Sequence, residues 1–390
     1  MTLIKLKYLC SSFSTPITQD EIKEVGTYPV FGAGGLVGFK EEYMCEKPYL
    51  GIIKDGAGVG RISKYSEKSS LLGTMAYIIP NKLSDINWLM YVIMSLDLGK
   101  EISSTTIPHI YFKDYGNKYV LLPSVSEQQH IANFLDTECA RIDAVIEKTR
   151  ASIEEYKKME QLVITQAVTK GIRPKRVMQE SSIDWIGKYP SDWICEKVKY
   201  VAAISRGLFN HRPRNDERYY DGPYPFIQTG DVAQATKYIT SYSQTLNELG
   251  KSVSKEFPKG TLTMTIAANV GDVAILGFDA YFPDSVVGFV PKEGIDGLYL
   301  YYIFSAMKEE FVRTAIKSTQ LNLNIDRVKE LFIPVTFDIH EQKEIVDYLE
   351  KKCSEIDELI SKKKLIVNEL EKYKKALIFE YVTGKKEVPA

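Results

Sequence analysis

Apolar residues recur with the same spacing in two distant stretches of the chain. The spacing alternates between three and four residues, and this period of about 3.5 is typical of a coiled-coil seam when it holds over several heptads. The first stretch carries the stripe at Leu135, Cys139, Ile142, Ile146, Ile153, Tyr156, Val163 and Ala167. The second carries it, in the same phase, at Leu349, Cys353, Ile356, Ile360, Val367, Leu370, Leu377 and Tyr381. The pattern predicts two long helices that are copies of one structural unit.

Both stretches also share their start and stop signals. A small polar residue stands three positions before a glutamate at the start of each stretch, which is the pattern of a capping box. A glycine follows each stripe, and glycine accepts the left-handed conformation that ends a helix. The residues are Ser124, Glu127 and Gly171 in the first copy, and Asp338, Glu341 and Gly384 in the second.

The segment before each predicted helix contains short apolar runs separated by glycine, which indicate β-strands. In residues 1–122 the runs are 28–31, 49–53 and 75–79, followed by a predicted helix over 85–98. The second segment repeats this order, with Lys197 and Pro291 in the places of Lys5 and Pro80.

These repeats predict an α+β fold. We expect a tandem pseudo-repeat of two α/β globules, each followed by a long helix, with the two helices pairing as an antiparallel coiled coil. The predicted boundaries are 1–122 for the first globule, 123–185 for the first helix and its connector, 186–333 for the second globule, and 334–390 for the second helix.

The polar positions within the two stripes constrain how the helices pair. An antiparallel arrangement in which Glu160 faces Lys363 and Val163 lies near Ile360 keeps the apolar positions together. One alternative is a parallel pairing, which would set Glu160 against Lys374 but leave the two globules side by side. The other is a seam shifted by one heptad.

Composition and charge limit the kinds of partner and the cellular compartment to be expected. The 390 residues carry a net charge of −1, so nucleic-acid binding would need local basic patches rather than a general positive field. Five scattered cysteines without a Cys-x-x-Cys pair favour a reducing, cytoplasmic compartment. The N-terminus does not read as a signal peptide, and the longest apolar patch, 86–96, is too short to span a bilayer.

Several longer motifs together resemble the specificity subunit of type I restriction–modification enzymes. The first predicted helix opens on Leu-Pro-Ser-Val-Ser-Glu-Gln at 122–128, and the second on Ile-Pro at 333–334 followed by His-Glu-Gln at 340–342. The first helix closes on Thr-Lys-Gly-Ile at 169–172. A segment that ends in Tyr-Pro-Ser-Asp-Trp, residues 183–193, leads into the second globule. Residues 1–122 contain no such lead-in, in which they depart from the pattern of the family.

The resemblance implies a DNA-recognition subunit that is not itself an enzyme. Each globule would be a target-recognition domain that reads one half of a split site in double-stranded DNA. The paired helices would act as a ruler and would dock two adenine methyltransferase subunits, which restriction subunits can join. The methyltransferase subunits, and not this chain, would bind S-adenosylmethionine, so no cofactor is expected here.

The residues themselves favour neither catalysis nor a metal site. No Asn-Pro-Pro-Tyr-type methylation motif occurs, and the four histidines lack ligand spacing. The glycine-rich stretch 56–60 is followed by a strand-like run rather than by the helix that would hold a phosphate, so we interpret it as a tight turn.

Candidate DNA contacts are basic and polar loop residues, because arginine pairs with phosphate or guanine and asparagine with adenine. In the second globule they are Arg206, Asn210, His211, Arg212, Arg214, Ser318, Thr319, Gln320 and Asn322. In the first they are Lys54, Arg61, Lys64, Ser104, Thr105 and Thr106. The alternative for the arginine loop is a solvated segment neutralised by Asp216 and Glu217. The alternative for the whole chain is a coiled-coil scaffold with two protein-binding globules and no DNA recognition.

Overall fold

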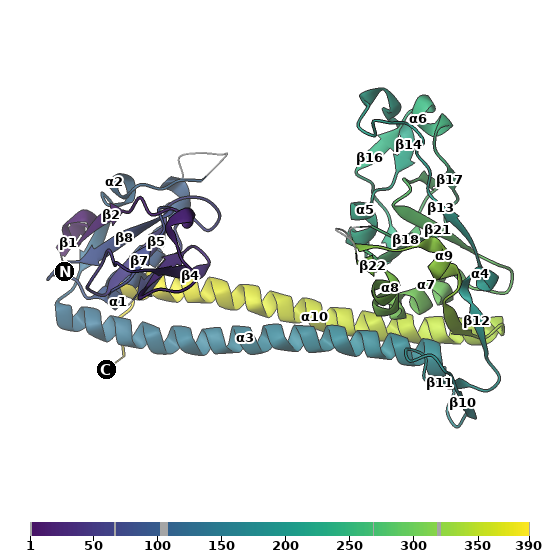
Figure 1. Cartoon of the computed structure of the whole chain (residues 1–390). Coiled ribbons are helices and arrows are strands. Elements are labelled where there is room, and N and C mark those ends of the chain that lie inside the picture. The colour runs from purple at the N-terminus through teal and green to yellow at the C-terminus, as the bar shows by residue number, and fades with distance from the viewer. Residues whose placement is uncertain (1, 66–67, 102–107, 268, 318–320, 390) are drawn as a thin grey trace. The chain divides into compact units, whose positions relative to one another are not determined.

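The computed structural model describes residues 2–389 apart from 66–67, 102–107, 268 and 318–320. The chain forms two compact units. Unit 1 comprises Met1–Ala151 with Lys363–Ala390, and unit 2 comprises Ser152–Lys362. The division passes through both long helices, α3 (Val125–Lys170) and α10 (Ile339–Val382), so each unit contains a globule and a segment of each helix (Figure 1).

Unit 1 is built on a four-stranded antiparallel sheet in the order β2-β8-β5-β6. A three-stranded sheet, β4-β3-β7, and a two-stranded ladder, β1-β9, complete it. The strands are β1 (Thr2–Lys5), β2 (Cys10–Ser14), β3 (Tyr28–Gly32), β4 (Gly35–Lys40), β5 (Tyr49–Ile53), β6 (Ile62–Tyr65), β7 (Ser70–Leu71), β8 (Met75–Pro80) and β9 (Tyr119–Leu122). The helices of the globule are α1 (Ile86–Ser95) and α2 (Phe112–Tyr115).

Unit 2 repeats this plan with additions. A five-stranded sheet runs β13-β21-β18-β19-β15, a four-stranded sheet runs β16-β14-β20-β17, and β12 pairs with β24. Its main strands are β12 (Ile194–Lys197), β13 (Ala202–Arg206), β14 (Tyr220–Phe226), β15 (Tyr238–Ile239), β16 (Gln244–Leu246), β17 (Glu256–Phe257), β18 (Leu262–Thr265), β19 (Val273–Leu276), β20 (Ala280–Tyr281), β21 (Val286–Pro291) and β24 (Phe332–Val335). Short pairs also occur as β10 (Met178–Glu180) with β11 (Lys188–Pro190), and β22 (Ile316–Lys317) with β23 (Leu321–Asn322). The helices are α4 (Val198–Val201), α5 (Thr229–Gln234), α6 (Glu248–Ser252), α7 (Gly297–Ala306), α8 (Lys308–Thr314) and α9 (Ile325–Lys329).

The strand registers confirm the predicted repeat. Pro80 pairs with Cys10 at the end of β8, and Pro291 pairs with Ala202 at the end of β21. An apolar helix of 10 residues follows in each unit, α1 in unit 1 and α7 in unit 2. Each of them belongs to the core that α3 and α10 share with the globule. The α+β tandem pseudo-repeat expected from the sequence is therefore present.

Both long helices end as predicted, and one of them also starts as predicted. Gly171 and Gly384 each take a φ of +68° after the last turn, a conformation that costs glycine little. Ser124 and Glu127 form the full capping box, since each side chain accepts from the other residue's backbone N–H. In the second copy Asp338 caps the helix by accepting from the backbone N–H of His340. The side chain of Glu341 accepts from Arg176 instead of from the backbone N–H of Asp338, which donates to Thr336, so the second half of the predicted capping box is absent there.

The two long helices pair antiparallel within each unit. In unit 1, Asp143 pairs with Lys374 at 2.6 Å and Arg150 with Glu371 at 2.6 Å, so positions on α10 fall as those on α3 rise. In unit 2, Ile153 lies in one buried cluster with Ile356 and Ile360. The predicted antiparallel coiled coil is confirmed.

The predicted register is wrong by about one heptad. The carboxylate of Glu160 lies beside Cys353 and Asp357 rather than Lys363, and Tyr156 rather than Val163 packs against Ile360. A shift of seven residues keeps the phase of the heptad stripe but changes which polar stripe positions face one another. The expected pairing of Glu160 with Lys363 favoured the wrong seam.

Cysteine crosslinking checks the corrected register within unit 2. With the native cysteines replaced, a pair at Tyr156 and Ile360 is expected to oxidise readily to an intramolecular disulfide, because these side chains share one cluster. A pair at Val163 and Ile360 serves as the matched control and should not crosslink. Preferential crosslinking of the control pair, seen as a mobility shift on a non-reducing gel, would restore the original register.

Glu160 makes the seam sensitive to pH. Burial, and then the nearby Asp357, raise the pKa of Glu160, while burial raises the pKa of Cys353 to about 12, so the thiol is the donor between them. A carboxyl with a raised pKa binds its proton more tightly in the folded chain. Its protonated form therefore stabilises the fold, and that contribution is lost as pH rises through the raised value.

We expect Glu160→Gln to raise the melting temperature at pH 7–8. The corresponding gain in the free energy of unfolding should be less than about 1 kcal/mol. The advantage should disappear near pH 4, where the wild-type carboxyl is itself protonated. The matched control is Glu155→Gln, which removes the same charge from an exposed position of the same helix. Thermal denaturation of the three chains across this pH range measures the effect. If Glu155→Gln raises the melting temperature by the same amount, the effect comes from the change in net charge and not from the burial of Glu160.

Candidate nucleic-acid interface

A buried glutamine fastens each globule to its long helix. Gln128 and Gln342 are both fully buried and occupy the same position in the two helical repeats. In each case the side-chain amide donates to two backbone carbonyls, and its oxygen accepts from the backbone N–H of an aspartate. The partners are Leu83, Pro123 and Asp85 in unit 1, and Gly294, Thr336 and Asp296 in unit 2. The contact distances lie between 2.7 and 3.0 Å.

The two aspartates connect this clamp to the apolar helix of each globule. Asp85 caps α1 and Asp296 caps α7, each accepting from two backbone N–H groups of the first turn. One glutamine therefore fixes the long helix, the preceding loop and the start of the globule's helix together. A buried amide with all three of its contacts satisfied gives a defined geometry, because any other arrangement leaves polar groups unpaired.

A second contact repeats along the same interface. The hydroxyl of Tyr91 on α1 donates to Asp136 on α3 at 2.7 Å, and that of Tyr302 on α7 donates to Glu350 on α10 at 2.5 Å. Burial raises the pKa of both phenols, so each is a hydrogen-bond donor at neutral pH. The buried glutamine and this tyrosine thus attach each globule to its long helix in equivalent places.

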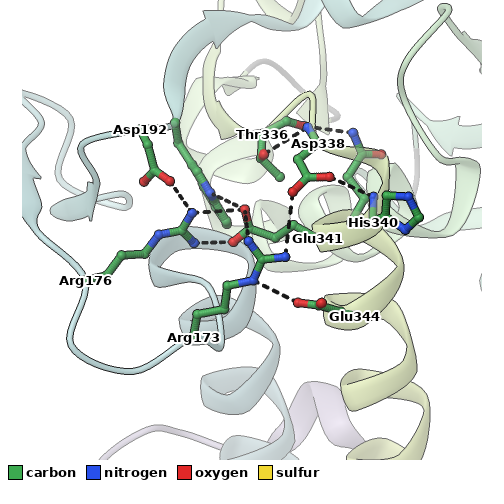
Figure 2. Close-up of polar contacts among 10 residues, drawn as sticks. Arg173, Arg176, Asp192, Thr336, Asp338, His340, Glu341 and Glu344 are labelled. Atoms are coloured by element: carbon green, nitrogen blue, oxygen red, sulfur yellow. Dashed lines mark hydrogen bonds and ion pairs between the residues drawn. The ribbon is translucent and has the colours of Figure 1, made fainter.

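In unit 2 the start of α10 carries a buried ion cluster (Figure 2). Glu341 is only 1% exposed and accepts a hydrogen bond from the guanidinium of Arg176. The guanidinium of Arg173 lies 3.7 Å from the same carboxylate. The indole N–H of Trp193 donates to the same carboxylate at 3.3 Å. Hydrogen bonding to Glu341 raises the pKa of Arg176 further above its ordinary range. The cluster joins the end of α3, the lead-in segment 183–193 and the start of α10.

Three of the candidate arginines converge on Asp284 at the edge of unit 2, two at its carboxylate and one at its backbone carbonyl. Arg214 pairs with the carboxylate of Asp284, Arg212 lies 3.7 Å from it, and the Nε of Arg206 donates to the backbone carbonyl of Asp284 at 2.5 Å. All three arginines are exposed. Together they form a positively charged edge held by a single acid, which we call the arginine edge (Arg206, Arg212, Arg214).

The rest of the loop is organised by Asp216. His211 contacts Asp216 at 2.9 Å and stacks on Tyr219, with ring centroids 3.9 Å apart. Arg218 pairs with the same carboxylate at 2.7 Å and, as the main cause, lowers its pKa. Asn210 is exposed next to this pair. The acids that pair with the loop arginines are therefore Asp216 and Asp284. Asp284 is far away in sequence and was not expected.

The basic candidates of unit 1 do not share an acid. Lys54 pairs with Asp55 at 2.6 Å, while Arg61 donates to the carbonyl of Ala33 at 2.7 Å. Lys64 donates to the side chain of Asn87 on α1 at 2.9 Å.

Several candidates fall outside the described residues. They are Ser104, Thr105, Thr106, Ser318, Thr319 and Gln320. Asn322 belongs to β23, but its side chain is not described.

Sequence reasoning missed the residues that attach the globules. Gln128 and Gln342 follow the paired glutamates directly, so their recurrence at the same repeat position was the available signal. No such signal existed for Asp284, because its partners lie on a loop some seventy residues earlier.

Neither a metal site nor a membrane-spanning helix occurs in the part of the chain that the structure describes. It holds no group of three or more histidine, cysteine, aspartate or glutamate side chains placed to bind a metal ion. Its helices include none with the length and apolar character needed to cross a membrane. The five cysteines are free thiols.

The sequence matches the type I restriction modification DNA specificity domain over residues 3–155 and 190–372. Because these segments cover most of the chain, the protein belongs to the type I restriction–modification specificity family. It is 26% identical to the type I restriction enzyme MjaVIII specificity subunit of Methanocaldococcus jannaschii over 353 residues, which are 86% of this chain and 79% of that protein. It is 32% identical to the MjaIX specificity subunit of the same organism over 184 residues, 46% of this chain and 41% of the relative.

A solved structure of the type I R-M system, concerned with its complex assembly and conformational transition, contains a chain with the same fold. The TM-score is 0.73 at 14% identity, and the match covers 99% of this chain and 98% of the other.

Proposed function

We propose that this chain is a non-catalytic, sequence-specific DNA-binding subunit that reads a bipartite target for a type I restriction–modification complex. The observation that carries the proposal is the duplicated attachment of a globule to a long helix through Gln128 and Gln342. Identical attachments with different loops suit two recognition domains held in a constant way, each reading its own short sequence. The target would then be two different half-sites separated by bases that are not read.

The arginine edge is the proposed phosphate- and guanine-contacting surface of the second domain, with Asn210 and His211 beside it. The corresponding contacts in the first domain would come from Lys54, Arg61 and Lys64. Support for the arginine edge is its exposure together with the convergence of three guanidinium groups, which suits bidentate recognition. The polar residues at 104–106 and 318–322 complete the proposed contact set.

Two adenine methyltransferase subunits are the proposed partners of the long helices, and restriction subunits would join them. Apolar side chains are exposed at equivalent repeat positions of the two helices, Val145 and Met159 on α3, and Leu359 and Tyr373 on α10. Exposed apolar side chains repeated in this way suit two identical partners, each binding one copy. Those partners would supply S-adenosylmethionine binding and the methyl transfer.

Mapping modified adenines in DNA from cells that carry this chain with its methyltransferase tests the proposal. We expect two different half-sites separated by a spacer of constant length and unrestricted sequence. A continuous or palindromic site would contradict it. The purified chain alone is expected to transfer no methyl group, and a DNA affinity independent of salt would favour the protein-binding scaffold instead.

A further inference from the structure

A pocket of about 240 Å³ opens in unit 2 beside the arginine edge. It involves the strands β14 and β16, which lie at the end of unit 2 away from the long helices (Figure 1). Arg214 of the arginine edge lines the pocket, and so do Pro283 and Ser285, the two neighbours of Asp284. Pockets for drug-sized molecules measure about 300–1,000 Å³, so this pocket suits a smaller ligand. The pocket and the arginine edge form one continuous surface.

Three aromatic side chains form the apolar part of the pocket. Phe209, Tyr220 and Phe226 line it and belong to one small aromatic cluster. The ring of Phe209 stacks on that of Tyr220 with centroids 5.7 Å apart, and its centroid lies 5.4 Å from that of Phe226. The hydroxyl of Tyr220 donates to the backbone carbonyl of Arg214, which ties the loop to this wall. Aromatic walls of this kind suit a flat aromatic ligand, because such rings stack on one another.

Two partly buried glutamines supply the polar part of the pocket. The Nε2 of Gln228 donates to the Oε1 of Gln244 at 2.9 Å. The side chain of Gln228 also accepts from the backbone N–H of Asp231, so this amide is held in one orientation. Among the described residues, none accepts a hydrogen bond from the side-chain nitrogen of Gln244. Gln244 therefore has two N–H donors to offer to a ligand, and amide donors of this type pair with the acceptor atoms of a base edge.

We propose that this pocket, the base pocket (Phe209, Tyr220, Phe226, Gln228 and Gln244), holds one unstacked nucleobase of the DNA half-site that unit 2 reads. The aromatic walls stack on the base, and the amide of Gln244 donates to its edge. The exposed guanidinium of Arg214 pairs with the phosphate of the same nucleotide. One ligand thus accounts for the aromatic, hydrogen-bonding and cationic parts of one surface.

This inference rests on the proposed function, because it takes DNA as the ligand of unit 2. A free nucleotide has the same chemistry, and the experiments below separate the two sources. A base in a paired duplex must leave the stack to enter the pocket, and this costs least for a base that is already mismatched. The base pocket therefore predicts a site at which loss of pairing strengthens binding.

A mismatch scan of the mapped target is the direct test. Each base pair of both half-sites is replaced in turn by a mismatch that keeps one of its two bases, and the assembled complex is titrated with each duplex. We expect one mismatch to tighten binding at least about threefold, because the retained base no longer has to be unpaired. If no mismatch tightens binding, the base pocket is wrong.

Variants of the pocket show where the unpaired base lies. Gln244→Ala removes the free donors, and Asn215→Trp fills the pocket from an exposed loop position. Each should abolish the gain from the mismatch. Gln234→Ala makes the same truncation at an exposed position of α5 outside the pocket and should keep the gain. Persistence of the gain in either pocket variant, or its loss in Gln234→Ala, overturns the placement.

Deoxynucleoside monophosphates test a free nucleotide as the source. Added to the purified chain without DNA, they should not saturate any fluorescence change below about 1 mM, because one nucleotide lacks the other contacts of the half-site. Saturation at micromolar concentration, together with a flat mismatch scan, would overturn the assignment to DNA. The affinity for the paired target relative to unrelated DNA, measured in the same titrations, tests the proposed function separately. Specific binding without any mismatch gain removes only the base pocket, whereas absence of specific binding removes the proposed function as well.

Discussion

Replacing Arg176 by alanine is expected to destabilise unit 2 by about 3 kcal/mol, the lower end of the usual range for removing one partner of a buried ion pair. The reason is that the side chain of Glu341, which is 1% exposed, would be left with Arg173 and the indole of Trp193 as its polar neighbours. Urea denaturation followed by the fluorescence of the chain measures the loss. Arg150→Ala is the matched control, because its pair with Glu371 is exposed and should contribute at most about 1 kcal/mol.

A double variant separates the buried charge from the lost packing. Arg176→Met combined with Glu341→Leu removes both charges and should be much less destabilised than Arg176→Ala alone. If the double variant loses as much as the single one, the ion pair itself and not the orphaned carboxylate provides the stability.

Removing the arginine edge should have the largest effect on DNA binding. The triple variant Arg206→Ala, Arg212→Ala, Arg214→Ala is expected to lower the affinity of the assembled complex for its target at least about 100-fold, at roughly 1 kcal/mol or more for each arginine. The slope of log affinity against log salt concentration should fall by about 0.9 for each phosphate that the variant no longer neutralises. Binding titrations at several salt concentrations measure both quantities.

Removing the charge of Asp284 changes the electrostatics of the arginine edge in the opposite direction. Asp284→Asn removes the acid that pairs with Arg212 and Arg214 and is expected to tighten DNA binding several-fold. Asp326→Asn makes the same change of net charge on α9, where the acid pairs with Lys329, and should have little effect. Weaker binding by the Asp284 variant would mean that the acid positions the arginines more than it competes with phosphate.

The periodic features of this protein could be predicted from its sequence. The apolar stripes, Ser124 with Glu127, and the glycines at 171 and 384 all act within one helical turn or one helix, so local pattern is sufficient to place them. The repeat then gave the fold class, because two copies of one pattern must bury the same faces. The antiparallel pairing followed from the split target that the family resemblance implies, because only this orientation would send the two globules to opposite ends; a parallel pairing would bury the same faces.

Tertiary structure decided between arrangements that the local sequence pattern does not distinguish. The seam register is one example: the polar stripe positions favoured the seam in which Glu160 faces Lys363, whereas the folded chain places Glu160 beside Cys353. Glu127 and Glu341 are another, because the same capping motif stays exposed in one copy and is buried against Arg176 and Trp193 in the other. The arginine edge shows the same limit: its charges are visible in the sequence, but Asp284 reaches them only after a sheet has formed. Contacts between residues far apart in the chain depend on packing that no short window of sequence contains.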